Sequence, residues 1–157
     1  MGKKNLAMDP AKKVEDEFRR LSIEIRLLEE TARTLQSRLN LVNTAIADMT
    51  YAHSTLEGLE EKKEGSELLI HVGGNSYIRA KLHEPDKVIV GMGAGVSIDK
   101  TLGDAKEIIK KRFEGLGETR KSLEQRFSQV AQKINEDQAM LEELAAELRK
   151  GKASQNV

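Results

Sequence analysis

The chain of 157 residues contains no cysteine and no tryptophan, has only two prolines, and is 3% aromatic. Without cysteine it has neither disulfides nor thiolate metal ligands, which fits a reducing compartment, and we expect it to be cytoplasmic. No apolar run approaches the roughly 20 residues that a membrane span needs, and the opening MGKKNLAMDP lacks the apolar core of a secretory signal. Few aromatic residues together with 33% charged residues indicate long helices rather than a large globular core.

Net charge is absent as well, because 26 basic side chains balance 26 acidic ones. A balanced chain has no overall field that would attract nucleic acid or anionic lipid, so we expect neither nucleic acid nor membrane as a partner. The segment KEIIKKRF, residues 106–113, and the basic N-terminus keep nucleic-acid binding open as an alternative, against which the interleaved acidic residues count.

A heptad pattern fills the first third of the sequence. From Val14 to Leu56, apolar residues recur at alternating steps of four and three, with His53 as the one polar member, and we interpret His53 as a polar layer that fixes register. The pair Asp9-Pro10 is a helix start signal, and EEKKEGS, with Gly65, is a stop signal. We therefore predict a helix over about residues 10–63.

A second heptad series begins after Thr101, with Lys106, Arg120 and Asp137 as its polar members, and ends before the helix-closing RKG motif. Because each apolar seam needs a partner and the chain folds back between the two series, we expect an antiparallel coiled coil with Leu56 level with Ile109. The glycines of FEGLGETR predict a point of bending. The predicted division is a flexible tail (1–9), helix one (10–63), a linking segment (64–101), helix two (102–150) and a flexible tail (151–157).

The linking segment has the composition of strands and turns. ELLIHV, YIRAKL, VIVGM and VSID are four short β-rich runs separated by GGNS, HEPD and GAG, which predicts two successive β-hairpins. Four short strands on a two-helix stalk enclose no core of their own and leave apolar side chains and backbone edges exposed. The hairpins therefore need other chains to complete them.

GMGAG, residues 91–95, invites a nucleotide-loop interpretation that its details disfavour. It lacks the spacing G-x-G-x-x-G, has no following Lys-Ser/Thr and leads into a β-rich run rather than a helix. Tight hairpins need positive φ and closely packed barrels need backbone without Cβ, so we interpret Gly91, Gly93 and Gly95 as architectural.

The sequence contains no arrangement of residues that predicts an enzyme active site. His53, His71 and His83 fall on a helix, a strand and a turn, without the converging carboxylates that a metal site requires. A two-helix stalk offers no pocket for a nucleophile and base. We expect neither a catalytic constellation nor a metal nor a cofactor.

Several apolar residues fall outside the heptad seam near the chain ends. Ile23 and Leu27, one turn apart, point away from the partner helix, and Met140 lies at nearly the same level. A cluster of this kind is an expected binding surface for other apolar groups. The predicted apolar tip comprises Leu6, Met8, Phe18, Ile23, Leu27, Met140, Leu141, Leu144 and Leu148.

The order of long helix, two hairpins and long helix, with VGGNSYIRAKL followed by VIVGMGAGV, closely resembles the archaeal-type, two-hairpin alpha subunits of prefoldin. The resemblance implies an α+β, mainly α fold: a long antiparallel two-helix coiled coil joined by two β-hairpins that contribute to an intersubunit β-barrel platform. It implies a hexamer of two alpha-type and four beta-type chains. The implied oligomerisation residues are Leu68, Ile70, Val72, Ile78, Ala80, Leu82, Val88, Val90, Met92, Val96 and Ile98.

The resemblance also implies an ATP-independent chaperone, a holdase, that grips non-native polypeptides at its coiled-coil tips and delivers them to a group II chaperonin. The alternative is a structural coiled-coil adaptor whose hairpins serve only to dimerise the chain. The adaptor would assemble as two chains and would not suppress aggregation.

Overall fold

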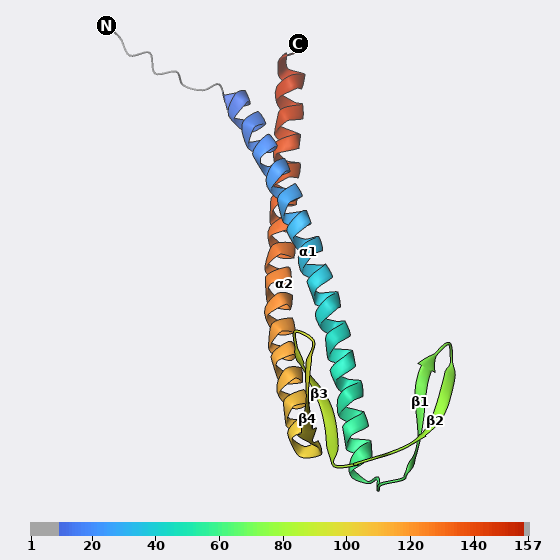
Figure 1. The fold of residues 1–157 in the computed structure, drawn as a ribbon. Helices are drawn as coiled ribbons and strands as arrows, with labels where there is room; N and C mark the ends of the chain where they lie inside the picture. Colours follow the sequence, from blue (N-terminus) through green and yellow to red (C-terminus); the bar gives the residue numbers. More distant parts are fainter. Residues whose placement is uncertain (1–9, 156–157) are drawn as a thin grey trace. The chain divides into compact units, whose positions relative to one another are not determined.

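The computed structural model describes residues 10–155, with side chains described as far as residue 151. It contains two long helices joined by two antiparallel β-hairpins, which confirms the mainly helical fold expected from the sequence (Figure 1). In chain order the elements are α1 (Pro10–Glu60), β1 (Glu67–Gly73), β2 (Ser76–Lys81), β3 (Lys87–Gly93), β4 (Val96–Thr101) and α2 (Leu102–Gln155).

The C-terminal end of each helix differs from its predicted position. Helix α1 ends at Glu60 rather than near residue 63, because the Lys62 amide donates to the Leu59 carbonyl at 3.0 Å in a tighter final turn. Helix α2 does not end before Gly151 but continues to Gln155. Gly151 does not have the positive φ of a helix-ending glycine. A single glycine inside a helix lowers the stability of that helix by only about 1 kcal/mol.

The start of α2 follows directly from β4 and is fixed by two hydrogen bonds. The Thr101 hydroxyl accepts from the Asp104 amide at 3.1 Å, the N-cap that the sequence indicates. The Leu102 amide donates to the Asp86 carbonyl at 2.8 Å. The second hairpin is therefore tied to the first turn of α2 at both of its ends.

The chain divides into two units, which we call the terminal unit and the hairpin unit. The terminal unit comprises the chain up to Asn40 and from Lys121 onward, and the hairpin unit comprises Leu41–Arg120. In the terminal unit an ion pair of 3.7 Å between Glu24 and Lys133 joins α1 to α2. Among the described residues of this unit, the buried apolar ones all belong to the predicted seam: Leu21, Ile25, Leu35, Leu39 and Leu123.

The hairpin unit has its own small core, in which Leu56 of α1, Val90 of β3, and Ala105 and Ile109 of α2 pack together. Leu56 and Ile109, which the sequence predicts to lie at the same level, both belong to this cluster. An ion pair of 2.7 Å between Glu60 and Lys106 joins the helices nearby. The core is completed by the partly buried Met49, Ala52, Leu59, Val88, Leu102 and Ile108.

The two hairpins have the same register and the same kind of turn. Gly73 pairs with Ser76 and Gly93 with Val96, so each loop has two residues, and all residues of both loops have positive φ. Gly93 and Gly95, at φ 100° and 78°, confirm the architectural interpretation of these glycines, whereas Gly91 is not a positive-φ residue.

Candidate functional site

The first hairpin, β1–β2, presents an apolar face that the rest of the described chain leaves open. Leu68 pairs with Ala80 and Ile70 with Ile78, so these four side chains lie on one face, which we call the first-hairpin face. Ile70 is 45% and Ile78 52% exposed, and the neighbouring Val72, at the bulge, is 56% exposed. Exposed aliphatic side chains grouped on one face indicate a surface that another molecule covers.

The equivalent face of the second hairpin is partly buried inside the chain. Val90 is only 6% exposed, because it packs on Leu56, Ala105 and Ile109, and Val88 is half-buried against the same cluster. The resemblance assigns Val90 to a face completed by other chains, whereas in the structure the chain's own helices cover it. The remaining implied residues of this hairpin are more exposed: Ile98 (37%), Met92 (49%) and Val96 (55%).

The opposite faces of the hairpins also carry exposed apolar residues, which the sequence analysis did not single out. Leu69 is 69%, Tyr77 59% and Ile89 76% exposed. For Leu69 and Ile89 the signal was present in the sequence, since LLI (68–70) and VIV (88–90) are continuous apolar runs, as in strands buried on both faces. Leu82, which follows β2, is half-buried, and its amide extends the hairpin ladder by donating to the Ser66 carbonyl at 2.9 Å.

Arg112 of α2 adds a polar contact between helix and hairpin. Its Nη2 donates to the Gly91 carbonyl at 2.7 Å and lies 3.9 Å from the Met92 sulfur. A guanidinium bonded to a strand carbonyl fixes where the second hairpin sits on the helix. This contact depends on tertiary placement, so spacing in the sequence could not have identified it.

The terminal unit carries the residues predicted for the apolar tip. Ile23 is 59%, Leu27 58% and Met140 48% exposed, in agreement with their positions outside the seam. Phe18, Leu141, Leu144 and Leu148 are half-buried, and Leu6 and Met8 lie outside the described residues. We call the described members the terminal apolar set: Phe18, Ile23, Leu27, Met140, Leu141, Leu144 and Leu148.

Among the residues of the terminal unit whose side chains the structure describes, Asp137 is the buried polar one. Its exposure is 0%, its Oδ1 accepts from Lys133 at 2.5 Å, and its Oδ2 has no hydrogen-bond partner. The hydrogen bond to Asp137 raises the pKa of Lys133 above its ordinary value of 10.5. The heptad pattern placed Asp137 in the seam, and a carboxylate there weakens helix pairing compared with leucine.

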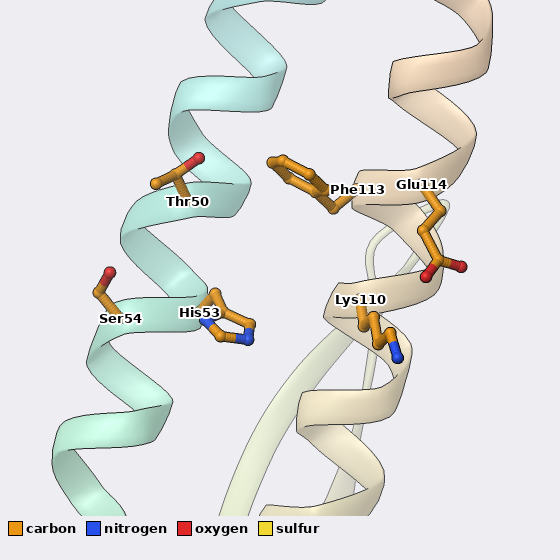
Figure 2. Close-up of a pocket in the computed structure, with 6 residues that line it drawn as sticks. All are labelled: Thr50, His53, Ser54, Lys110, Phe113 and Glu114. Atoms are coloured by element: carbon orange, nitrogen blue, oxygen red, sulfur yellow. The ribbon is translucent and has the colours of Figure 1, made fainter.

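A cavity of about 420 Å³ opens between α1 and α2 inside the hairpin unit, and Figure 2 shows its lining. His53 and Phe113 project toward the space from opposite helices. Phe113, which the pattern placed in the seam, is 44% exposed here, and His53 Nδ1 lies 3.5 Å from Glu57 on its own helix. The remaining lining residues are Thr50, Ser54, Lys110 and Glu114.

The described chain offers no site for a metal or for a membrane span. Among residues 10–155, no group of three or more histidine or acidic side chains could hold a metal ion. Neither helix, over its described length, has an apolar stretch long enough to cross a membrane. GMGAG forms the β3 end and turn of the second hairpin, so it does not lead into a helix N-terminus.

Comparisons with known proteins match the chain to one family. Residues 28–147 match the Prefoldin family, described as prefoldin subunit. Prefoldin subunit alpha of Methanococcoides burtonii is 32% identical over 76% of this chain and 87% of its own. Prefoldin subunit alpha of Methanobrevibacter smithii is 30% identical over 84% of this chain and 90% of its own. A chain of filamentous PFD from Methanocaldococcus jannaschii, solved by cryo-EM, is similar in structure, with a TM-score of 0.63 and 25% identity over 74% of this chain and 96% of that one.

Proposed function

Since the chain belongs to the prefoldin family of chaperone subunits, we propose that it acts as the alpha-type subunit of an ATP-independent holdase in the cytoplasm. The terminal apolar set holds non-native polypeptides, and the hairpins join the chain to its partner subunits. The complex contains two alpha-type and four beta-type chains and passes its clients to a group II chaperonin.

The observation that carries the proposal is the pair Ile23 and Leu27. They lie one turn apart on α1, each more than half exposed, while Leu21 and Ile25 beside them are buried in the helix pair. Two aliphatic side chains that point away from a completed seam serve no packing purpose inside the chain. They are suited to contact exposed apolar side chains of an unfolded polypeptide.

Each such contact is weak, because two exposed aliphatic side chains contribute only a few kcal/mol of apolar burial. When six chains surround one client, these weak contacts act together, and the complex binds the client more tightly than any single chain does. Weak individual contacts also permit release without nucleotide hydrolysis, because a chaperonin that binds the same apolar segments can compete for them one at a time.

The assembly role rests on the hairpins. A single two-stranded hairpin is marginally stable in water and gains stability when its apolar face is covered. The exposed Ile70, Ile78 and Val72 of the first hairpin, and Met92 and Val96 of the second, support a platform of strands completed by other subunits. We propose that this platform is an intersubunit β-barrel.

An aggregation assay tests the holdase function. Complex containing Ile23→Glu with Leu27→Glu is compared with wild type for suppressing aggregation of citrate synthase diluted from denaturant. We expect half-maximal suppression to need at least about tenfold more variant complex, because apolar contacts at every alpha-type chain are lost. The matched control, Thr31→Glu with Thr34→Glu, adds the same charge to exposed positions of the same helix and should behave as wild type.

Native mass spectrometry of the intact complex separates the holdase from the adaptor alternative. Six chains, two of them this one, support the chaperone assembly. A dimer of this chain that leaves citrate synthase aggregation unchanged would establish the adaptor instead.

A further inference from the structure

A groove of about 400 Å³ lies in the terminal unit, and its lining includes Leu27, one of the two side chains proposed to hold clients. The lining extends along α1 from Leu27 to Arg38, a distance of about three turns. Arg126 contributes a second guanidinium from α2, so a ligand in the groove contacts both helices of the unit. The other lining residues are Glu30, Thr31, Thr34 and Leu35.

The two arginines of the groove are exposed and, among the side chains that the structure describes, form neither an ion pair nor a hydrogen bond. The two threonine hydroxyls already donate to carbonyl groups of their own helix, at 2.9 and 3.0 Å. Each guanidinium carries five N–H donors in a planar fork that matches the two oxygens of a carboxylate. The donors that the groove offers to a ligand are therefore suited to an acidic side chain.

The two ends of the groove differ in chemistry. Leu27 is 58% exposed and Leu35 only 4%, so an aliphatic side chain can pack at the Leu27 end. The carboxylate of Glu30 lies near this end and repels other carboxylates, which directs an acidic side chain toward the arginines. Leu27 and Arg38 are about 16 Å apart along the helix, a distance that an extended peptide covers in about five residues.

We propose that this groove binds an acidic segment of a partner protein, in which carboxylates follow an aliphatic residue, and that the bound segment displaces a held client from Leu27. The proposal rests on the proposed function, because it names the kind of partner that takes a client from the complex. A segment that contacts the arginines as well as Leu27 has an advantage over a purely apolar client segment. Release by this route requires no nucleotide.

A polypeptide suits the groove better than a nucleic acid does. Phosphates also pair with arginine, but a sugar–phosphate strand offers no aliphatic side chain to Leu27, and its repeated charges would be repelled by Glu30. The chain has 26 basic and 26 acidic residues, so no overall field attracts a polyanion. An acidic segment with an aliphatic residue matches both ends of the groove.

Fluorescence anisotropy with the purified complex tests the binding step. The probe is a fluorescein-labelled peptide in which glutamates follow a leucine. Arg38→Gln with Arg126→Gln should raise the Kd of this peptide at least about tenfold, because both charge-assisted contacts are lost. Arg33→Gln with Lys121→Gln removes the same charge, one residue from each helix, outside the groove lining, and should bind the peptide as wild type does. Equal affinities of these two variants would overturn the proposal.

Client release tests the displacement step. Complex that holds labelled citrate synthase is mixed with the acidic peptide or with a matched peptide in which glutamines replace the glutamates. The acidic peptide alone should speed release from wild type, at least about threefold, and should have no such effect on Arg38→Gln with Arg126→Gln. An acidic peptide that binds without changing the release rate would contradict the proposal. So would an oligonucleotide of equal charge that displaces the peptide at the same concentration.

The variant Thr31→Glu with Thr34→Glu gives an independent measurement. It leaves Ile23 and Leu27 unchanged, so it should suppress aggregation as wild type does. Its two added carboxylates lie in the groove lining and repel acidic side chains, so the acidic peptide should no longer speed client release. If the peptide speeds release from this variant as it does from wild type, the acidic segment does not bind in the groove.

Failure of this inference is distinguishable from failure of the proposed function. A wild-type complex that suppresses aggregation but does not respond to the acidic peptide would sink the groove inference and leave the holdase intact. A complex that binds the peptide through Arg38 and Arg126 but holds no citrate synthase would instead sink the holdase and, with it, the role of the groove in release.

Discussion

The two hairpins share one backbone design but differ in their surroundings. Both have a bulge before the turn and a two-residue loop with positive φ, yet Val90 is 6% exposed and its equivalent Ile70 is 45% exposed. Local sequence therefore determines the shape of each hairpin, whereas the way in which the hairpin is connected to its helix determines how far its apolar face is buried. The second hairpin runs directly into α2, and the first is linked to α1 by residues 61–66.

The difference assigns distinct roles to similar strands. The second hairpin contributes to the core of the hairpin unit, so its apolar face is part of the stability of the chain itself. The first hairpin contributes no buried residue to that core, so its apolar face is available for assembly. Substitutions at equivalent positions should consequently have different effects.

The largest difference is expected between Val90→Asp and Ile70→Asp. A carboxylate at Val90 would be buried among apolar side chains without a partner and should lower the free energy of unfolding by about 4 kcal/mol. At Ile70 the carboxylate stays in water, so the free chain should unfold as wild type. Urea unfolding of the free chain, followed by circular dichroism, measures both. Equal decreases in the free energy of unfolding for the two variants would show that the two hairpins contribute equally to the stability of the free chain.

Glycine substitutions at the bulges should differ in the extent of the structure that they affect. Gly93 and Gly73 have φ values of 100° and 102°, where a β-branched residue is strained by about 1 to 3 kcal/mol. Gly93→Val should transmit this cost to global unfolding, because the second hairpin packs on the helices. Gly73→Val should instead reduce amide protection only within β1–β2. Hydrogen exchange resolves the two patterns, and global loss from Gly73→Val would contradict the comparison.

A smaller effect is expected at Arg112. Replacing it with methionine keeps the aliphatic stem but removes the hydrogen bond to the Gly91 carbonyl, so the free energy of unfolding should fall by about 1 kcal/mol. Arg79→Met is the control on the first hairpin, because Arg79 is 84% exposed and lies 4.0 Å from Glu67. A thermal unfolding series should show a lower Tm for the first variant only.

Sequence periodicity was sufficient to predict the helices, the hairpins and the turns. Heptad spacing identified Leu21 and Ile25 as seam residues and left Ile23 and Leu27 outside it, and their exposures agree. Turn composition located both loops, because two-residue hairpin loops require residues that tolerate positive φ. These features depend on neighbours along the chain, which the sequence displays directly.

Contacts between distant segments could not be predicted in the same way. Ala105 is fully buried although it lies outside the predicted seam, because that side of α2 faces β3 as well as α1. The seam pattern likewise located Asp137 but not its unpartnered oxygen, and it located Phe113 but not the cavity beside it. In each case the outcome depends on how two elements pack, which no single element's pattern contains.

The smallest predicted effect concerns the entry to each hairpin. Lys87 donates to Glu84 at 2.6 Å, and this hydrogen bond lowers the pKa of Glu84 below its ordinary value of 4.5 and raises that of Lys87 above 10.5. At the equivalent positions of the first hairpin, Glu64 and Glu67 are both acidic, so the pair cannot form there.

The Glu84 carboxylate thus contributes stability that is complete above pH 4.5 and is lost as pH falls through its lowered folded pKa. The Lys87 contribution is complete below pH 10.5 and is lost as pH rises through its raised folded pKa. Both side chains are about half exposed, so solvent screening keeps the effect small. In the Glu84→Gln variant, amide protection near β3 should no longer decrease as the pH falls. In the Glu64→Gln variant, it should decrease as it does in wild type. If hydrogen exchange between pH 3 and 5 is the same in wild type and Glu84→Gln, the pair does not help to hold the second hairpin in place.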